Sequence, residues 1–187
     1  MFKVILGLLL VTAVAVAVWR LARPGQIPAV GSAAPDFRLP DQDGKPRQLA
    51  DYAGRWLVLY FYPRDDTPGC TREACRFRDD IGSLQRLGAA VIGVSLDDSA
   101  SHAAFARKHQ LPFPLLSDPA GKTAAAYGSL LNLGVVRLAH RHTFIIGPDG
   151  CIAAVFTRVD PDRHAAEVAQ VLREIKRNSV KAGGLLQ

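Results

Sequence analysis

From about residue 34 the chain alternates between short apolar runs and longer amphipathic stretches, and the spacing within each predicts an element. Helices are expected where apolar residues recur every three or four positions, with Ser99 as one helix cap; their ranges are 70–87, 99–109, 122–127 and 162–176. Strands are expected in β-rich apolar runs between turn signals, at 57–62, 89–95, 113–118 and in both arms of 142–157. Two further short strands should flank the turn at Asp43-Gly44.

These elements follow the order β-α-β-α-β-β-α after the two short strands. The middle strands are apolar throughout, so helices must cover both faces of their sheet. The last two strands flank Pro148-Asp149-Gly150, a turn sequence typical of a hairpin. A hairpin after strand-helix-strand units adds antiparallel strands to a parallel sheet. The sequence therefore predicts an α/β, thioredoxin-like fold with a mixed central sheet flanked by helices.

The N-terminus differs from the rest of the chain, because residues 4–19 are an uninterrupted apolar run. As a helix this run rises about 24 Å, against a hydrocarbon core of roughly 30 Å. Trp19 and Arg20 at its end suit the membrane interface. We therefore expect residues 1–22 to form a membrane anchor, with contacts from residues 2–21. A signal sequence cleaved after Ala17 is the alternative, because Ala15-Val16-Ala17 fits the cleavage pattern.

The anchor is expected to lead through a linker, residues 23–33, into a folded domain at 34–178 and a flexible tail at 179–187. Basic residues on the two sides of the apolar run nearly balance, so they do not fix its orientation. A cytoplasmic domain needs no membrane address, and an exported, periplasmic domain is therefore expected.

Composition narrows the classes of function. The net charge is +6 with a pI near 9.5, but the basic residues are scattered and not interleaved with aromatic ones, so no nucleic-acid partner is expected. Three cysteines are too few for a disulfide scaffold and show no paired zinc-ligand spacing. No metal or organic cofactor is called for.

Two of the three cysteines lie close together, in the stretch YFYPRDDTPGCTREAC at residues 60–75. Cys70 follows a strand and a Thr-Pro-Gly turn, and it opens a predicted helix. The first turn of a helix offers unpaired N–H groups and the positive end of the dipole, and both stabilise a thiolate over a thiol. Cys70 is therefore a candidate nucleophile.

Cys75 lies five residues further along the same predicted helix. That spacing separates the two Cα atoms by about 8.6 Å, whereas a disulfide needs roughly 4.4–6.8 Å. The two cysteines cannot bond while this helix is intact. Either they never bond, or the first turn opens during the reaction.

The same stretch resembles the active site of peroxiredoxins, whose shared pattern Pro-x-x-x-Thr-x-x-Cys matches here as Pro63, Thr67 and Cys70. A second cysteine five residues later is similar to the Q type, also called bacterioferritin comigratory proteins. The stretch APDFRLPDQDG at 34–44 and the Arg-x-x-Phe of RHTF at 141–144 also resemble that family. The likeness covers about residues 30–177.

The resemblance implies a thiol peroxidase that reduces hydrogen peroxide and organic hydroperoxides. Cys70 would be the peroxidatic cysteine and would become a sulfenic acid. Arg141 would stabilise the thiolate and the leaving oxygen, the Thr67 hydroxyl would bind both sulfur and peroxide, and Pro63 would shield the pocket. Cys75 would then form an intramolecular disulfide with Cys70, which a thioredoxin-like or glutaredoxin-like reductant would restore. A monomer is expected.

Other groups receive simpler interpretations. Arg72 and Glu73 are expected to be helix-surface charges. His140 and His142 are expected to be a satisfied or exposed pair on the strand face opposite Arg141, without a third metal ligand. Cys151 opens a strand and is expected to serve packing.

Two other functions remain open. A membrane-tethered thiol–disulfide oxidoreductase shares the expected fold but normally carries Cys-x-x-Cys. A copper chaperone on such a fold would need Cys-x-x-x-Cys, one residue shorter than the spacing here.

Overall fold

The computed structural model describes residues 25–183, with side chains as far as residue 179. Its central sheet has the strand order β5-β4-β3-β8-β9. The strands β3 (Trp56–Phe61), β4 (Ala89–Ser95) and β5 (Leu115–Ser117) pair in parallel, and β8 (Thr143–Ile146) pairs antiparallel with both β3 and β9 (Ile152–Phe156). The predicted mixed sheet and terminal hairpin are therefore confirmed.

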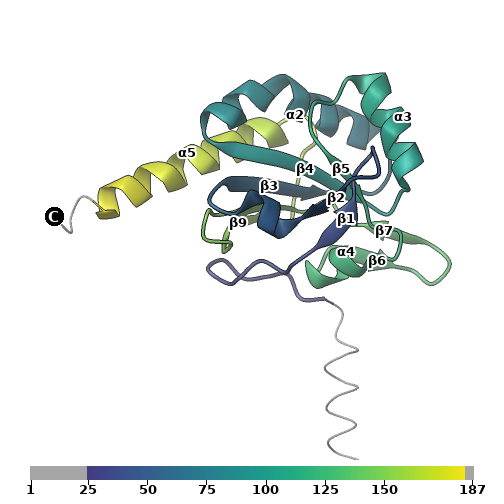
Figure 1. The fold of residues 1–187 in the computed structure, drawn as a ribbon, viewed down its shortest axis with the longest axis horizontal. Coiled ribbons are helices and arrows are strands. Elements are labelled where there is room, and N and C mark those ends of the chain that lie inside the picture. The colour runs from purple at the N-terminus through teal and green to yellow at the C-terminus, as the bar shows by residue number, and fades with distance from the viewer. Residues whose placement is uncertain (1–24, 184–187) are drawn as a thin grey trace, which may run out of the picture.

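Helices cover both faces of this sheet (Figure 1). One face carries α2 (Pro68–Arg86), α3 (Ser99–His109) and α5 (His164–Gly183), and the other carries the short helix α4 (Lys122–Ala126). The face with α4 also holds a 3-10 turn, η1 (Leu49–Tyr52), and two small hairpins. The β1–β2 hairpin (Arg38–Pro40, Pro46–Gln48) was expected from its turn. The β6–β7 hairpin (Leu130–Asn132, Arg137–Ala139) was not.

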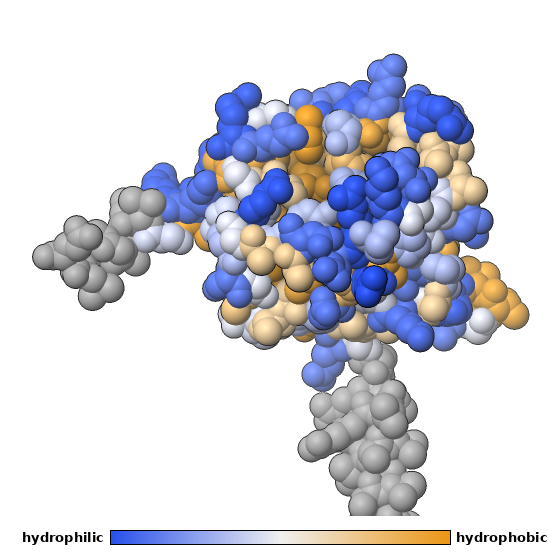
Figure 2. Space-filling model, in the orientation of Figure 1, coloured by the Kyte–Doolittle hydropathy of each residue, from blue (hydrophilic) through white to orange (hydrophobic). Residues whose placement is uncertain are grey.

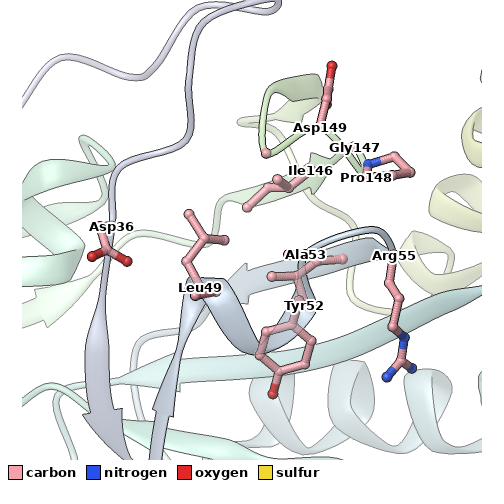
Figure 3. Close-up of a pocket in the computed structure, with 12 residues that line it drawn as sticks. Asp36, Leu49, Tyr52, Ala53, Arg55, Ile146, Gly147, Pro148 and Asp149 are labelled. Atoms are coloured by element: carbon pink, nitrogen blue, oxygen red, sulfur yellow. The ribbon is translucent and has the colours of Figure 1, made fainter.

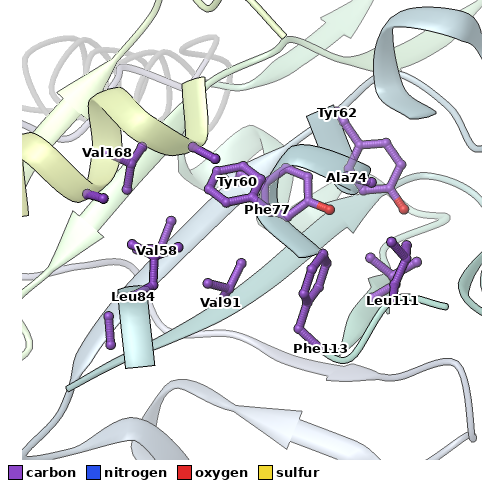
Figure 4. Packing of buried hydrophobic residues seen from close by; sticks show 14 of the residues in the cluster. Val58, Tyr60, Tyr62, Ala74, Phe77, Leu84, Val91, Leu111, Phe113 and Val168 are labelled. Atoms are coloured by element: carbon purple, nitrogen blue, oxygen red, sulfur yellow. The ribbon is translucent and has the colours of Figure 1, made fainter. Parts of the chain in front are cut away.

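The apolar strand β3 separates two hydrophobic cores because its side chains alternate between the faces. Val58 and Tyr60 contribute to a core with α2, α3 and α5, drawn in Figure 4. Leu57 and Leu59 contribute to the core on the α4 face. A strand buried on both sides has no room for polar positions, which explains its continuous apolar pattern.

Three boundaries differ from expectation. Helix α2 begins at Pro68, so Cys70 is its third residue rather than its first. Helix α3 is capped by Asp98 and not by Ser99, because the Asp98 carboxylate accepts the Ser101 N–H at 2.8 Å. Helix α5 continues to Gly183, so residues 179–183 are helical where a flexible tail was expected.

The expected anchor at 1–22 and the first linker residues lie outside the described residues. Within residues 25–183, no helix combines the length and the apolar character needed to cross a membrane.

Candidate active site

Cys70 lies in the first turn of α2, after the loop that follows the carboxyl end of β3. Thr67 occupies the N-cap position and Pro68 the first helical position, where its missing N–H costs nothing. The Cys70 side chain is buried, with an exposed fraction of 2%, and it packs in the core beneath α2. The turn formed by Thr67, Pro68 and Gly69 therefore directs the start of α2, and with it the Cys70 thiol, toward the core.

Arg141 reaches this thiol from the start of β8, the strand beside β3. It directly precedes the short segment that leads into β8, and β8 pairs antiparallel with β3, so Tyr60 lies opposite Thr143. The Arg141 Nη2 lies 3.3 Å from the Cys70 Sγ, and Nη1 donates to the carboxylate of Glu73. The sheet register thus joins residues that are 71 positions apart in sequence.

Glu73 is the main residue that the sequence interpretation placed wrongly. It was expected to be a helix-surface charge, but its side chain is fully buried and one oxygen, Oε1, lacks a hydrogen-bond partner in the described structure. Its position three residues after Cys70 was the available signal, since that spacing puts both on one helix face. Arg72 does lie on the surface, where it pairs with Asp162 at 3.4 Å.

Burial and ion pairing have opposite effects on the pKa values of Glu73 and Arg141. Burial raises the pKa of Glu73 to about 7, and Arg141 only partly opposes that rise. Burial disfavours the charge of Arg141, but the neighbouring Glu73 and Cys70 outweigh it, and the pKa of Arg141 is raised. Arg141 is therefore cationic at any physiological pH, whereas Glu73 changes charge near neutrality.

A buried polar network fixes the loop between β3 and α2. The Tyr62 hydroxyl donates to Asp65 at 2.8 Å, and the other Asp65 oxygen lies 2.8 Å from Nδ1 of His102 on α3. The His102 Nε2 lies 3.2 Å from the Leu116 carbonyl. Since a carbonyl only accepts, Nε2 carries the hydrogen of this contact, and Nδ1 faces Asp65.

The tip of the same loop is tied to the end of α3 at the surface. Asp66 has a φ of 54°, in the left-handed region, and its carboxylate pairs with Lys108 at 2.9 Å and His109 at 3.1 Å. The bonds from Lys108 and His109 lower the pKa of Asp66. Loop and helix start are therefore held from both the buried and the exposed side.

Thr67 and Pro63 lie where the sequence predicted, on the loop before Cys70, and both are half-buried. The Thr67 hydroxyl donates to the Arg64 carbonyl at 3.0 Å. The expected bond from this hydroxyl to the Cys70 sulfur is therefore not made in this state.

Cys75 is half-buried on the same continuous helix, and both cysteines are free. Five helical residues turn the side chains about 140° apart, so a Cys70–Cys75 disulfide requires α2 to unwind locally. Cys151 lies elsewhere, before β9, in an isolated bridge with Ala33.

The histidine pair is accounted for by packing. The rings of His140 and His142 stack with centroids 5.3 Å apart, and the His142 Nδ1 lies 3.1 Å from the Ser129 hydroxyl. Burial and the neighbouring His140 lower the pKa of His142. Among residues 25–183, no group of three or more His, Cys, Asp or Glu side chains could hold a metal ion.

A separate cavity of about 330 Å³ lies near Tyr52, Leu57 and Ile146 (Figure 3). Leu57 is near the beginning of β3, whereas the Cys70 loop follows the end of that strand. The cavity is therefore at the opposite end of the sheet from Cys70.

Comparison with known proteins agrees with this geometry. The model of the AhpC/TSA family matches residues 30–155. The chloroplastic peroxiredoxin Q of Oryza sativa subsp. japonica is 42% identical over 146 residues, which are 78% of this chain and 67% of that protein. A peroxiredoxin sequence named bcp from Coxiella burnetii is 43% identical over 143 residues, covering 74% of this chain and 95% of its own length.

Solved structures carry the same fold. The crystal structure of peroxidoxin BcpB from Mycobacterium tuberculosis superimposes with a TM-score of 0.75 and 37% identity, over 79% of this chain and 98% of that one. Sequence, fold and the arrangement of Cys70 with Arg141 point to one conclusion. The chain belongs to the AhpC/TSA family, as a peroxiredoxin of the Q or bacterioferritin comigratory protein type.

Proposed function

We propose that this thiol peroxidase reduces hydrogen peroxide and organic hydroperoxides at Cys70. The Cys70 thiolate attacks the terminal oxygen of ROOH, the O–O bond breaks, and the departing RO⁻ takes a proton to leave as ROH. The sulfur is oxidised to a sulfenic acid. The observation that carries this assignment is the Arg141 guanidinium 3.3 Å from a buried sulfur in the first turn of a helix.

Arg141 is the electrostatic element of the reaction. Its fixed charge favours the thiolate and then the negative charge that develops on the leaving oxygen. Glu73 holds the other end of the guanidinium and so sets its direction. Thr67 is proposed to bind the hydroperoxide, for which its hydroxyl must leave the Arg64 carbonyl, and Pro63 is proposed to shield the pocket.

Cys75 is proposed to resolve the sulfenic acid. Its thiol attacks the Cys70 sulfur, water leaves, and a disulfide forms within the chain. The first turns of α2, from Cys70 to about Phe77, must unwind for this step because the helix separates the Cα atoms by about 8.6 Å. A thioredoxin-like or glutaredoxin-like reductant then returns both thiols.

The test is peroxide consumption by the full chain with a dithiol reductant, for wild type, Cys70→Ser and Cys75→Ser. Cys70→Ser should abolish turnover, because serine is not a low-pKa nucleophile. Without the reductant, Cys75→Ser should consume one equivalent and stop as the sulfenic acid. Appreciable turnover by Cys70→Ser would contradict the mechanism.

Peptide mapping and hydrogen exchange test the resolving step. In the oxidised wild type, exchange at residues 70–77 should be faster than in the reduced protein, while β4 is unaffected. A disulfide from Cys70 to Cys151 or to a second chain would assign the resolving role elsewhere.

We also propose that residues 2–21 anchor a monomeric enzyme to a membrane, with the catalytic domain on the exported side. The support is the apolar run at 4–19 with interfacial Trp19 and Arg20. Intact-mass measurement of membrane-fraction protein should find the segment present. A mature chain that starts near Val18 would establish the cleaved form instead.

A further inference from the structure

We propose that the tip of the β6–β7 hairpin is a docking surface for an anionic lipid bilayer, an inference that rests on the anchor proposed above. The tip carries three large apolar side chains with exposed fractions of 65% at Leu133, 100% at Val135 and 45% at Val136. The Leu133 N–H donates to the Val136 carbonyl at 2.9 Å, which closes the turn. Figure 2 shows apolar surface projecting at the right edge, where Figure 1 places this hairpin.

The described chain begins beside the root of this hairpin. A Cβ on Gly25 would lie 1.4 Å from the Ala125 carbonyl oxygen, and one on Gly128 would lie 2.5 Å from the backbone nitrogen of Ile27. Residues 25–27 therefore pack directly against the end of α4 and Gly128. Because β6 starts two residues after Gly128, the N-terminal segment and the hairpin leave the domain at neighbouring positions.

Chain lengths allow both to reach one surface. Trp19 precedes Gly25 by six residues, so the link between them spans at most about 20 Å. The hairpin arm from Gly128 to Val135 spans a similar distance, about 20 Å. A bilayer that holds Trp19 at its interface is therefore within reach of the hairpin tip.

The charged residues near the hairpin tip favour an anionic lipid surface over a neutral one. Residues 119–148 contain no aspartate or glutamate, while Lys122 and Arg137 in this stretch are exposed. The preceding Asp118 is buried and accepts the N–H groups of Lys122 and Ala124. Exposed Asp36 lies in the same pocket as Lys122, so Arg137, on the hairpin itself, is the cation that would meet anionic lipid headgroups beside the apolar tip.

Docking would also set the direction of the active site. The arm β7 ends at Ala139, two residues before Arg141. A bilayer contact at the tip and a second one through the anchor fix two points of the domain. The loop and thiol at Cys70 then keep one orientation relative to the headgroups.

Fluorescence quenching in vesicles tests the proposal. The full chain with Trp19→Phe and Val135→Trp is reconstituted in phosphatidylcholine and phosphatidylglycerol, with or without bromine on the acyl chains. The tryptophan at 135 should be quenched by the brominated lipid, above the constant signal of half-buried Trp56. A second exposed-site variant, Trp19→Phe with Asn178→Trp on α5, should not be quenched.

Circular dichroism checks that both variants are folded, which is expected because Val135 and Asn178 are exposed. Adding Leu133→Asp and Val136→Asp to the Val135→Trp variant should reduce the quenching by placing carboxylates at the tip. Full quenching in that variant would overturn the docking surface.

Vesicle flotation separates the docking proposal from the anchor. A chain that floats without quenching at position 135 overturns docking and leaves the anchor standing. A chain that does not float overturns both. A concentration-dependent spectral shift at position 135 without bromine quenching would assign the tip to a second copy of the chain and overturn the lipid contact.

Discussion

The two ends of the central sheet hold different kinds of site. At the carboxyl end of β3, the buried Cys70 lies against Arg141, and Arg141 pairs with the buried Glu73. At the opposite end, Leu57 and Ile146 border a cavity of about 330 Å³, with Cys151 nearby before β9. At the first end a fully buried thiol lies against a cation, whereas at the other the half-buried Cys151 has no such contact among the described residues.

The difference follows from strand direction. Parallel strands deliver their carboxyl ends to the N-termini of the following helices, so unpaired N–H groups and the positive dipole gather at that end. Cys70 lies in the first turn of one of these helices, α2, whereas Cys151 precedes a strand. Charge and backbone geometry therefore locate the chemistry of this protein better than cavity volume does.

Removing the positive charge of Arg141 should have the largest effect on the reaction at Cys70. Arg141→Ala should slow Cys70 oxidation by about 10²–10³-fold, comparable to the loss of one oxyanion donor. Stopped-flow measurement with hydrogen peroxide gives the rate, and Arg137→Ala, on the exposed β7 strand, is the matched control. A rate within a factor of three of wild type would contradict the role of Arg141.

Gly69→Ala tests the same contact without removing the charge. A Cβ at Gly69 would lie 3.2 Å from the Arg141 Nη2, so the guanidinium must move slightly. We expect a smaller loss of rate than in Arg141→Ala.

Breaking the buried hydrogen bonds between Asp65 and its partners Tyr62 and His102 should destabilise the fold near the loop that leads to Cys70. Asp65→Asn removes the buried carboxylate that contacts His102 and Tyr62 and should lower the free energy of unfolding by about 3 kcal/mol. Denaturant titration measures this, and Asp66→Asn is the control. Because the Asp66 pairs are exposed and asparagine tolerates a positive φ, that change should cost less than about 1 kcal/mol. Equal losses of stability at the two positions would show that the buried contacts of Asp65 do not hold the loop before α2.

The raised pKa of Glu73 predicts that the free energy of unfolding depends on pH. Its folded pKa of about 7 exceeds the unfolded value of 4.5, so the folded state binds the proton more tightly. The stabilisation is fully present below pH 4.5 and is lost as pH rises through 7, by up to about 3 kcal/mol at roughly 1.4 kcal/mol per pKa unit. Denaturant titrations from pH 4.5 to 8 should show this fall.

Glu73→Gln, which keeps the neutral shape, should remove that fall. The difference between the two titration series isolates the carboxyl group from other ionisations. An identical slope in both proteins would show that Glu73 does not titrate in this range.

The smallest effect is expected at the other end of the sheet. Cys151→Ser should change the free energy of unfolding by less than about 1 kcal/mol, since the side chain is only half-buried. Peroxide turnover should match wild type in the stopped-flow assay. A large loss of turnover would break the distinction between the two ends.

Much of the fold was predictable because its signals are local. The strands at 57–62 and 89–95 and the helix at 99–109 follow from runs and spacings that neighbouring residues determine. The β6–β7 hairpin was missed because its arms are three residues each and its turn, Leu133 to Val136, is apolar. Helix α5 was predicted too short because its last turns lie beyond the apolar positions that marked it.

The sequence by itself determined the order of the central strands and the main helices, the place of Cys70 near the start of a helix and the impossibility of a Cys70–Cys75 disulfide on an intact helix, because each depends only on local geometry. The resemblance suggested Arg141, but only the antiparallel register of β8 on β3 placed its guanidinium 3.3 Å from the sulfur. Tertiary structure alone decided that Glu73 is buried and that Asp65 meets His102. Burial and partners across the chain are set by packing between distant segments, and spacing along one segment does not specify them.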